Sequence, residues 1–156
     1  MDKFSDILSD LIIENNCSLR ELERRCGVAS SQLSRYLKGT IPNVKVAMTL
    51  ANYFECGLDY LFGLSDEKQN RFYANFDTHN FIKIYLDCLS KCNISHWKFS
   101  QKIGLNESCL RHWQAGESPN MSTLILIADN LGVSLDMFFE VTYSNRENKW
   151  RVLEKV

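Results

Sequence analysis

The stretch from Ser18 to Gly39, SLRELERRCGVASSQLSRYLKG, predicts two short helices joined by a tight turn. Ser18 is suited to cap the first helix because its hydroxyl can accept a hydrogen bond from a free backbone N–H, and Glu21 completes the spacing of a capping box. Gly27 stands where a chain can leave a helix through a left-handed conformation, which glycine tolerates. This order of cap, helix, glycine and second helix constrains the fold more strongly than any other feature of the chain.

Each of these helices is expected to have one apolar and one polar face. The apolar residues at helical spacing are Leu19, Leu22 and Cys26 in the first helix, and Leu33, Tyr36 and Leu37 in the second. The outward face of the second helix, Ser30 to Lys38, is short, polar and basic. Serine and glutamine can donate and accept hydrogen bonds, and arginine can bond guanine O6 and N7 together. Such a helix fits the major groove of DNA, with the first helix lying across the phosphates.

The register of the segment resembles the helix-turn-helix of the lambda-repressor and Cro type, the XRE family. The residues that carry the resemblance are Gly27, Val28, Leu33, Tyr36, Gly39 and Pro42. It implies a domain of five helices and assigns base reading to Ser30, Ser31, Gln32 and Arg35. We further expect phosphate contacts from nearby basic residues and from a helix N-terminus, at Arg20, Arg24, Lys38, Asn43 and Lys45.

Two residues depart from the family's pattern. Many relatives have a glutamine that bonds a phosphate where this chain has Leu19, and leucine cannot make that bond. Glu23 stands where the family usually has alanine, because the two helices approach closely at that position. We therefore expect the Glu23 side chain to swing outward, or the angle between the helices to open slightly.

The pattern restarts 77 residues further along, where Ser95 corresponds to Ser18 without a gap. The matching pairs include Phe4 and Phe81, Gly27 and Gly104, Leu33 and Leu110, Tyr36 and Trp113, Gly39 and Gly116, Pro42 and Pro119, and Asn43 and Asn120. Self-similarity at a fixed shift indicates a duplicated unit. We therefore predict an all-α fold with two tandem five-helix domains of the lambda-repressor type, a linker and a short tail. The expected boundaries are 1–64, 65–77, 78–140 and 141–156.

The second copy is less basic than the first. Its expected recognition helix, Asn106 to Ala115, has as DNA candidates Glu107, Ser108, Arg111 and His112. Glu107 could accept a bond from cytosine N4, but a phosphate would repel it. Two interpretations stay open: the second domain binds DNA, or it has become a dimerisation or scaffold domain. The tail could form a hairpin or a final helix that docks on the second domain or on another subunit.

Other function classes find little support in the sequence. The six cysteines form no CxxC pair, so we expect reduced, buried thiols, no metal site and a cytoplasmic protein. The three histidines fall on separate expected elements and no glycine-rich phosphate loop is present, so we expect neither an enzyme nor a cofactor. The N-terminus is acidic and amphipathic, unlike a signal peptide, and no apolar run is long enough to span a membrane.

These observations predict a transcriptional regulator, specifically a repressor, that binds double-stranded DNA sequence-specifically, with the first domain as the main reader. Because one such domain contacts few base pairs, we expect a homodimer. The alternative is a protein-interaction or adaptor module that keeps the fold without binding DNA. The sequence identifies no small-molecule effector.

Overall fold

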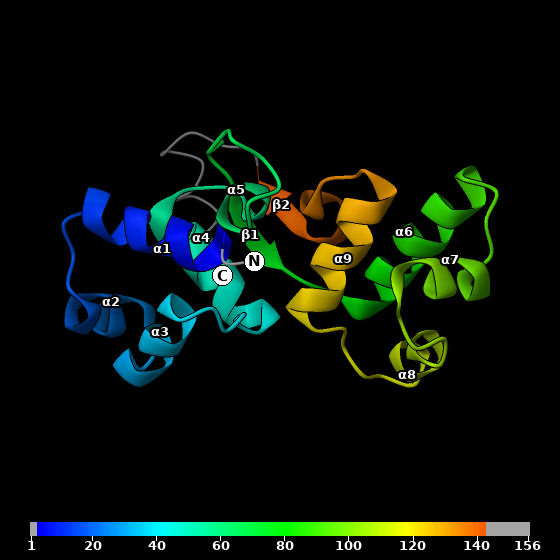
Figure 1. Cartoon of the computed structure of the whole chain (residues 1–156), viewed down its shortest axis with the longest axis horizontal. Helices are drawn as coiled ribbons and strands as arrows, with labels where there is room; N and C mark the ends of the chain where they lie inside the picture. Colours follow the sequence, from blue (N-terminus) through cyan, green and yellow to red (C-terminus); the bar gives the residue numbers. More distant parts are fainter. Residues whose placement is uncertain (1–2, 143–156) are drawn as a thin grey trace. The chain divides into compact units, whose positions relative to one another are not determined.

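A computed structural model describes residues 3–142 of the chain, and Figure 1 shows the order of its elements. Contacts group these residues into unit 1, which comprises residues 3–73 with Thr142, and unit 2, which comprises residues 74–141. Most of the described residues lie in helices, as the sequence predicts. Within residues 3–142, no helix is both long enough and apolar enough to cross a membrane.

Unit 1 contains five helices within residues 3–73, and local caps mark the starts of two of them. The five are α1 (Lys3–Glu14), α2 (Leu19–Cys26), α3 (Ser30–Leu37), α4 (Val44–Phe54) and α5 (Leu58–Leu61). The Ser18 hydroxyl accepts a hydrogen bond from the Glu21 N–H at 3.1 Å and caps α2. The Asn43 side-chain oxygen accepts one from the Val46 N–H at 2.8 Å and caps α4.

The core of unit 1 fixes the position of α3, which contacts both α1 and α2. Leu8, Leu22 and Leu33 are fully buried. The Phe4 ring stacks on Phe62 with 4.9 Å between centroids and meets the edge of Tyr36 at 6.3 Å. Apolar and aromatic burial of this kind is the main force that holds short helices together, since helices of this length are marginal alone. Because α3 buries Leu33 and Tyr36 against its neighbours, its polar side faces outward.

Residues 68–73 are folded onto the helices of unit 1 through backbone hydrogen bonds. The Gly57 N–H donates to the Lys68 carbonyl at 2.7 Å. The Asn52 side chain accepts from the Tyr73 N–H at 2.8 Å and donates to the Tyr73 carbonyl at 3.0 Å. The Leu58 N–H, at the start of α5, donates to the Tyr73 hydroxyl at 2.7 Å. Part of the stretch 65–77, expected as a linker, is therefore docked on unit 1 at Tyr73.

The prediction of an all-α fold is wrong in one respect, because a small sheet is present. Strand β1 (Phe72–Asn75) pairs with β2 (Glu140–Thr142). Phe72 and Tyr73 are buried, and aromatic residues of this kind are enriched in strands. The pairing joins segments far apart in the sequence, which local patterns do not reveal. Residues 143–156, on which the hairpin-or-helix prediction for the tail falls, lie outside the described residues.

Unit 2 contains α6 (Thr78–Lys91), α7 (His96–Ile103), α8 (Cys109–Gln114) and α9 (Met121–Leu131), followed by the 3-10 helix η1 (Leu135–Phe138). Gly132 ends α9 and Ser134 caps η1, so the fifth helix expected in this unit is present as a 3-10 helix and not an α-helix. The helix predicted from Asn106 begins only at Cys109. The reason is local, because the Asn106 side-chain oxygen accepts from both the Ser108 N–H and the Ser108 hydroxyl.

Aromatic rings gather around Phe81 in the core of unit 2. Its centroid lies 5.2 Å from that of Trp113 and 5.0 Å from that of Phe138, and both contacts are edge-on. Trp113 is 4% exposed and Tyr36 of unit 1 is 6% exposed. The inward position predicted for Tyr36 is therefore confirmed, and Trp113, which matches it in the sequence, is buried as well.

Tyr73→Phe should lower the free energy of unfolding by about 1–3 kcal/mol, because it leaves the buried Leu58 N–H without its acceptor. Urea denaturation followed by circular dichroism measures the change. Tyr53→Phe is the matched control, since within residues 3–142 the Tyr53 hydroxyl has no hydrogen-bond partner. Equal destabilisation by the two substitutions would contradict a role for the Tyr73 hydroxyl in docking this segment.

Candidate nucleic-acid interface

The turn between α2 and α3 sets the geometry of the candidate interface. Gly27 adopts a φ of 73°, and its N–H donates to the Glu23 carbonyl at 2.8 Å. This left-handed conformation lets the chain fold back on itself at little cost for glycine. Val28 then lies under the turn at 4% exposure. In Figure 1, α2 and α3 lie next to one another in unit 1, joined by this turn.

The exposed side of α3 has the residues expected to read bases. Ser31, Gln32 and Arg35 are exposed, and Lys38, the C-cap residue, is exposed as well. Within residues 3–142, neither Arg35 nor Lys38 has an ion-pair partner. Unpaired cationic groups on an exposed helix are suited to contact bases and phosphates.

Ser30 differs from the other candidates on α3, because it is half-buried and faces α2. Its N–H donates to the Glu23 Oε1 atom at 2.9 Å, and its hydroxyl donates to the same oxygen. These bonds stabilise the ionised carboxylate and hold the pKa of Glu23 below its ordinary value, with a smaller contribution in the same direction from the Arg20 charge. The Glu23 side chain is exposed, which agrees with the expectation that it swings outward.

The candidate phosphate contacts lie on three elements. Arg20 and Lys45 are exposed and have no ion-pair partner within the described part of the chain. Arg24 lies 3.9 Å from a Glu21 carboxylate oxygen, an exposed pair of the kind that contributes little and leaves the guanidinium accessible. The Asn43 side chain is occupied as the cap of α4, so any phosphate contact there would come from the backbone. Helix α2 contacts both α3 and α4.

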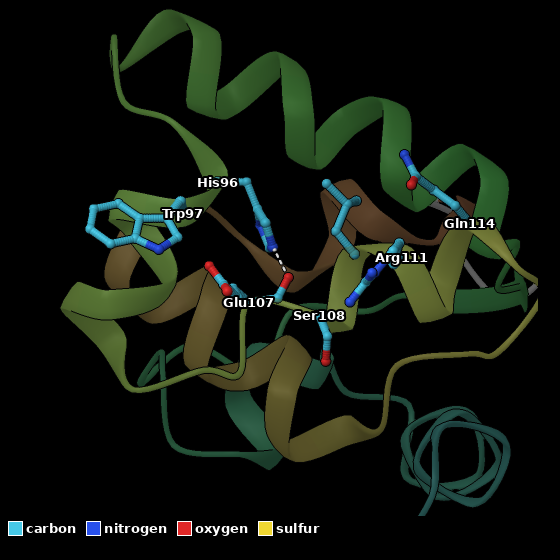
Figure 2. A pocket seen from close by; sticks show the side chains of 7 residues that line it. His96, Trp97, Glu107, Ser108, Arg111 and Gln114 are labelled. Carbon is cyan, nitrogen blue, oxygen red and sulfur yellow. Dashed lines mark hydrogen bonds between the residues drawn. The ribbon is translucent and has the colours of Figure 1, made fainter.

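Three of the four candidates in unit 2, Glu107, Ser108 and Arg111, line a hollow of about 330 Å³ that is drawn in Figure 2. Glu107 and Ser108 lie in the turn before α8, while Arg111 lies on α8 and is exposed. His112 is also exposed, but its Nδ1 atom lies 3.3 Å from a Glu117 carboxylate oxygen. Two carboxylates thus accompany the cationic candidates of unit 2, a less favourable setting for phosphate than that of α3.

Both ring nitrogens of His96 are engaged within unit 2. The Nδ1 atom lies 2.8 Å from the Tyr85 hydroxyl, and the Nε2 atom lies 2.9 Å from the Glu107 carbonyl, as the dashed line in Figure 2 marks. His96 therefore connects α6 to the turn before α8. The neighbouring Trp97 is 59% exposed and borders the same hollow.

The cysteines are all thiols, and three of the six are buried: Cys17, Cys56 and Cys88. Burial raises the pKa of Cys26 to about 11 and that of Cys56 to about 12, so these thiols are poor nucleophiles. The expectation of burial does not hold for Cys92, which is exposed. Among residues 3–142, no group of histidine, cysteine and acidic side chains is arranged to hold a metal ion.

The bond between Glu23 and Ser30 is a feature that sequence reasoning missed. The unusual residue at position 23 was evident, but the two residues lie seven positions apart on different helices. Their contact depends on how α2 and α3 pack, which no pattern within either helix specifies.

Comparison with known families gives one match: a family model described as Helix-turn-helix covers residues 8–61. No curated protein and no solved structure matches the chain. The matched residues contain α2, the turn at Gly27 and α3, together with α4 and α5. A domain of this kind indicates DNA binding in transcription regulation. Residues 8–61 thus form a helix-turn-helix domain of the XRE type.

Proposed function

We propose that the chain is a transcriptional repressor that binds double-stranded DNA sequence-specifically, with unit 1 as the main reader. The observation that carries the proposal is that Ser31, Gln32 and Arg35 on α3 and its C-cap residue Lys38 are exposed, with no ion-pair partner for Arg35 or Lys38 among residues 3–142, inside the matched segment 8–61. Arg35 can bond guanine in the major groove, while Arg20, Lys38 and Lys45 neutralise phosphates. A repressor of this kind would act by occupying promoter DNA, in the cytoplasm, where its thiols stay reduced.

We further propose that unit 2 is a second copy of the same fold. The caps support this, since Ser95 and Asn120 cap α7 and α9 as Ser18 and Asn43 cap α2 and α4. Two pairs of helices also agree in length: α2 and α7 have 8 residues each, and α4 and α9 have 11 each.

The role that fits unit 2 best is dimerisation. Glu107 and the Glu117 partner of His112 place negative charge around α8, which disfavours a phosphate backbone. Two copies of unit 1 in a homodimer would reach half-sites roughly 34 Å apart. Light scattering at micromolar concentration should therefore give the mass of a dimer, and a monomer at all concentrations would contradict this role.

Arg35→Ala should weaken binding to a preferred duplex by about 5- to 150-fold, the effect expected when a bidentate bond to guanine is removed. Fluorescence anisotropy with a duplex selected from a random pool measures the dissociation constant. Lys91→Ala is the charge-matched control, since Lys91 pairs with Asp87 on α6. Equal affinities of Arg35→Ala and Lys91→Ala would exclude Arg35 from the interface.

Lys45→Ala should lower the salt dependence of binding, because a cation that neutralises a phosphate releases counterions. The log–log slope of affinity against salt should become less steep by roughly 0.9 for each phosphate that is no longer neutralised. Arg111→Ala, in unit 2, should leave the slope unchanged if that unit dimerises. An unchanged slope with Lys45→Ala and a reduced one with Arg111→Ala would reverse the roles assigned to the units.

No salt-dependent binding of any duplex by the parent protein would favour the alternative function, a protein-interaction or adaptor module.

A further inference from the structure

Glu23 joins the two helices of the helix-turn-helix across their turn. One oxygen of its carboxylate, Oε1, accepts hydrogen bonds from both the backbone N–H and the hydroxyl of Ser30. Ser30 is the first residue of α3, and Glu23 lies near the middle of α2. The contact therefore fixes the start of one helix to the body of the other.

This contact supplies a cap that the local sequence lacks. The first N–H groups of a helix have no partner within it. Ala29, at the N-cap position of α3, has no side chain that could accept a hydrogen bond, and none is made there. Glu23 provides the acceptor from the preceding helix, and its negative charge is favourable at a helix N-terminus.

The same contact determines the orientation of Ser30. A serine hydroxyl has one proton to donate, and here that proton goes to Glu23. Ser30 is half-buried against α2, whereas Ser31 and Gln32 on the next positions are exposed. The side chains able to meet base edges are thus those that follow Ser30.

We infer that Glu23 is a positioning residue for sequence discrimination: with Ser30 it fixes the start of α3, so that Ser31, Gln32 and Arg35 meet the bases in one register. Ser30 belongs to this clamp, the paired hydrogen bonds between Glu23 and Ser30, and is not a base reader. The inference rests on the DNA-binding function proposed above.

The charge of Glu23 has a second consequence. The carboxylate is exposed beside α3, so it repels any phosphate that approaches it. This repulsion acts on preferred and unrelated duplexes alike, so we expect the charge to lower affinity for both without setting the base preference.

Three variants separate these effects. Glu23→Gln keeps a side-chain oxygen that can accept both bonds but removes the charge, whereas Glu23→Ala removes the bonds and the charge together. Ser30→Ala removes only the hydroxyl and leaves the backbone N–H bond possible. For each variant, anisotropy gives the ratio of dissociation constants for a scrambled duplex and for the duplex selected by the parent. Circular dichroism establishes that each variant is folded.

Glu23→Ala should lower the discrimination ratio about tenfold or more, an effect comparable to that of a mismatched base pair. Glu23→Gln should keep the ratio within about threefold of the parent, because the bonds to Ser30 stay possible, while it binds both duplexes more tightly because a repulsive charge is gone. Ser30→Ala should not change the preferred base at any position of the selected site. An unchanged ratio in Glu23→Ala, or a changed base preference in Ser30→Ala, would overturn the inference.

A DNA-free measurement distinguishes failure of the clamp from failure of the proposed function. An NMR titration of the Glu23 carboxyl should give a pKa below the ordinary value in the parent and a higher one in Ser30→Ala. Equal values would disprove the clamp even if the protein binds DNA. A parent that shows the shifted pKa but binds no DNA would retain the clamp, and would overturn both the proposed function and the discrimination role.

Discussion

The contact between α2 and α3 across the Gly27 turn is the constraint on which the rest of unit 1 depends. Gly27 turns the chain at a φ of 73°, and the burial of Leu22, Val28 and Leu33 holds the two helices against each other. Phe4 of α1 packs on Tyr36 and Phe62, so the first helix covers the inner side of α3. The polar side of α3 is exposed as a direct result, because a helix that buries one stripe must expose the opposite one.

The features that the sequence predicts well are those set by a few neighbouring residues. Ser18, Asn43 and Asn120 are caps because their side chains reach an N–H three residues ahead. The features that it misses depend on packing between distant segments. The β1–β2 pairing joins Phe72–Asn75 to Glu140–Thr142, and the clamp at Glu23 needs two helices already in place. The late start of α8 has a local cause that the spacing of apolar residues does not reveal. The Asn106 side chain accepts a hydrogen bond from the Ser108 N–H, which competes with helix formation there.

The two units expose different charge on corresponding helices. On α3, Arg35 and Lys38 have no acidic partner within residues 3–142, while on α8 His112 lies beside Glu117 and Glu107 precedes the helix. Position 23 contrasts with its counterpart Ser100, which is fully buried and donates to the His96 carbonyl at 2.7 Å. Ser100 is small and buried inside unit 2, whereas in unit 1 the exposed carboxylate of Glu23 accepts hydrogen bonds from Ser30 at the start of α3. These differences are those expected if, as proposed, the two units are copies of one fold and only the first reads DNA.

If α3 is the surface through which the chain meets DNA, amide NMR on addition of the selected duplex should show it. The largest chemical-shift changes should fall at Ser31 to Lys38, with smaller ones at the starts of α2 and α4 and little change in α8. Changes confined to unit 2, or no changes at a protein concentration far above the dissociation constant, would exclude α3 as the DNA-contacting surface.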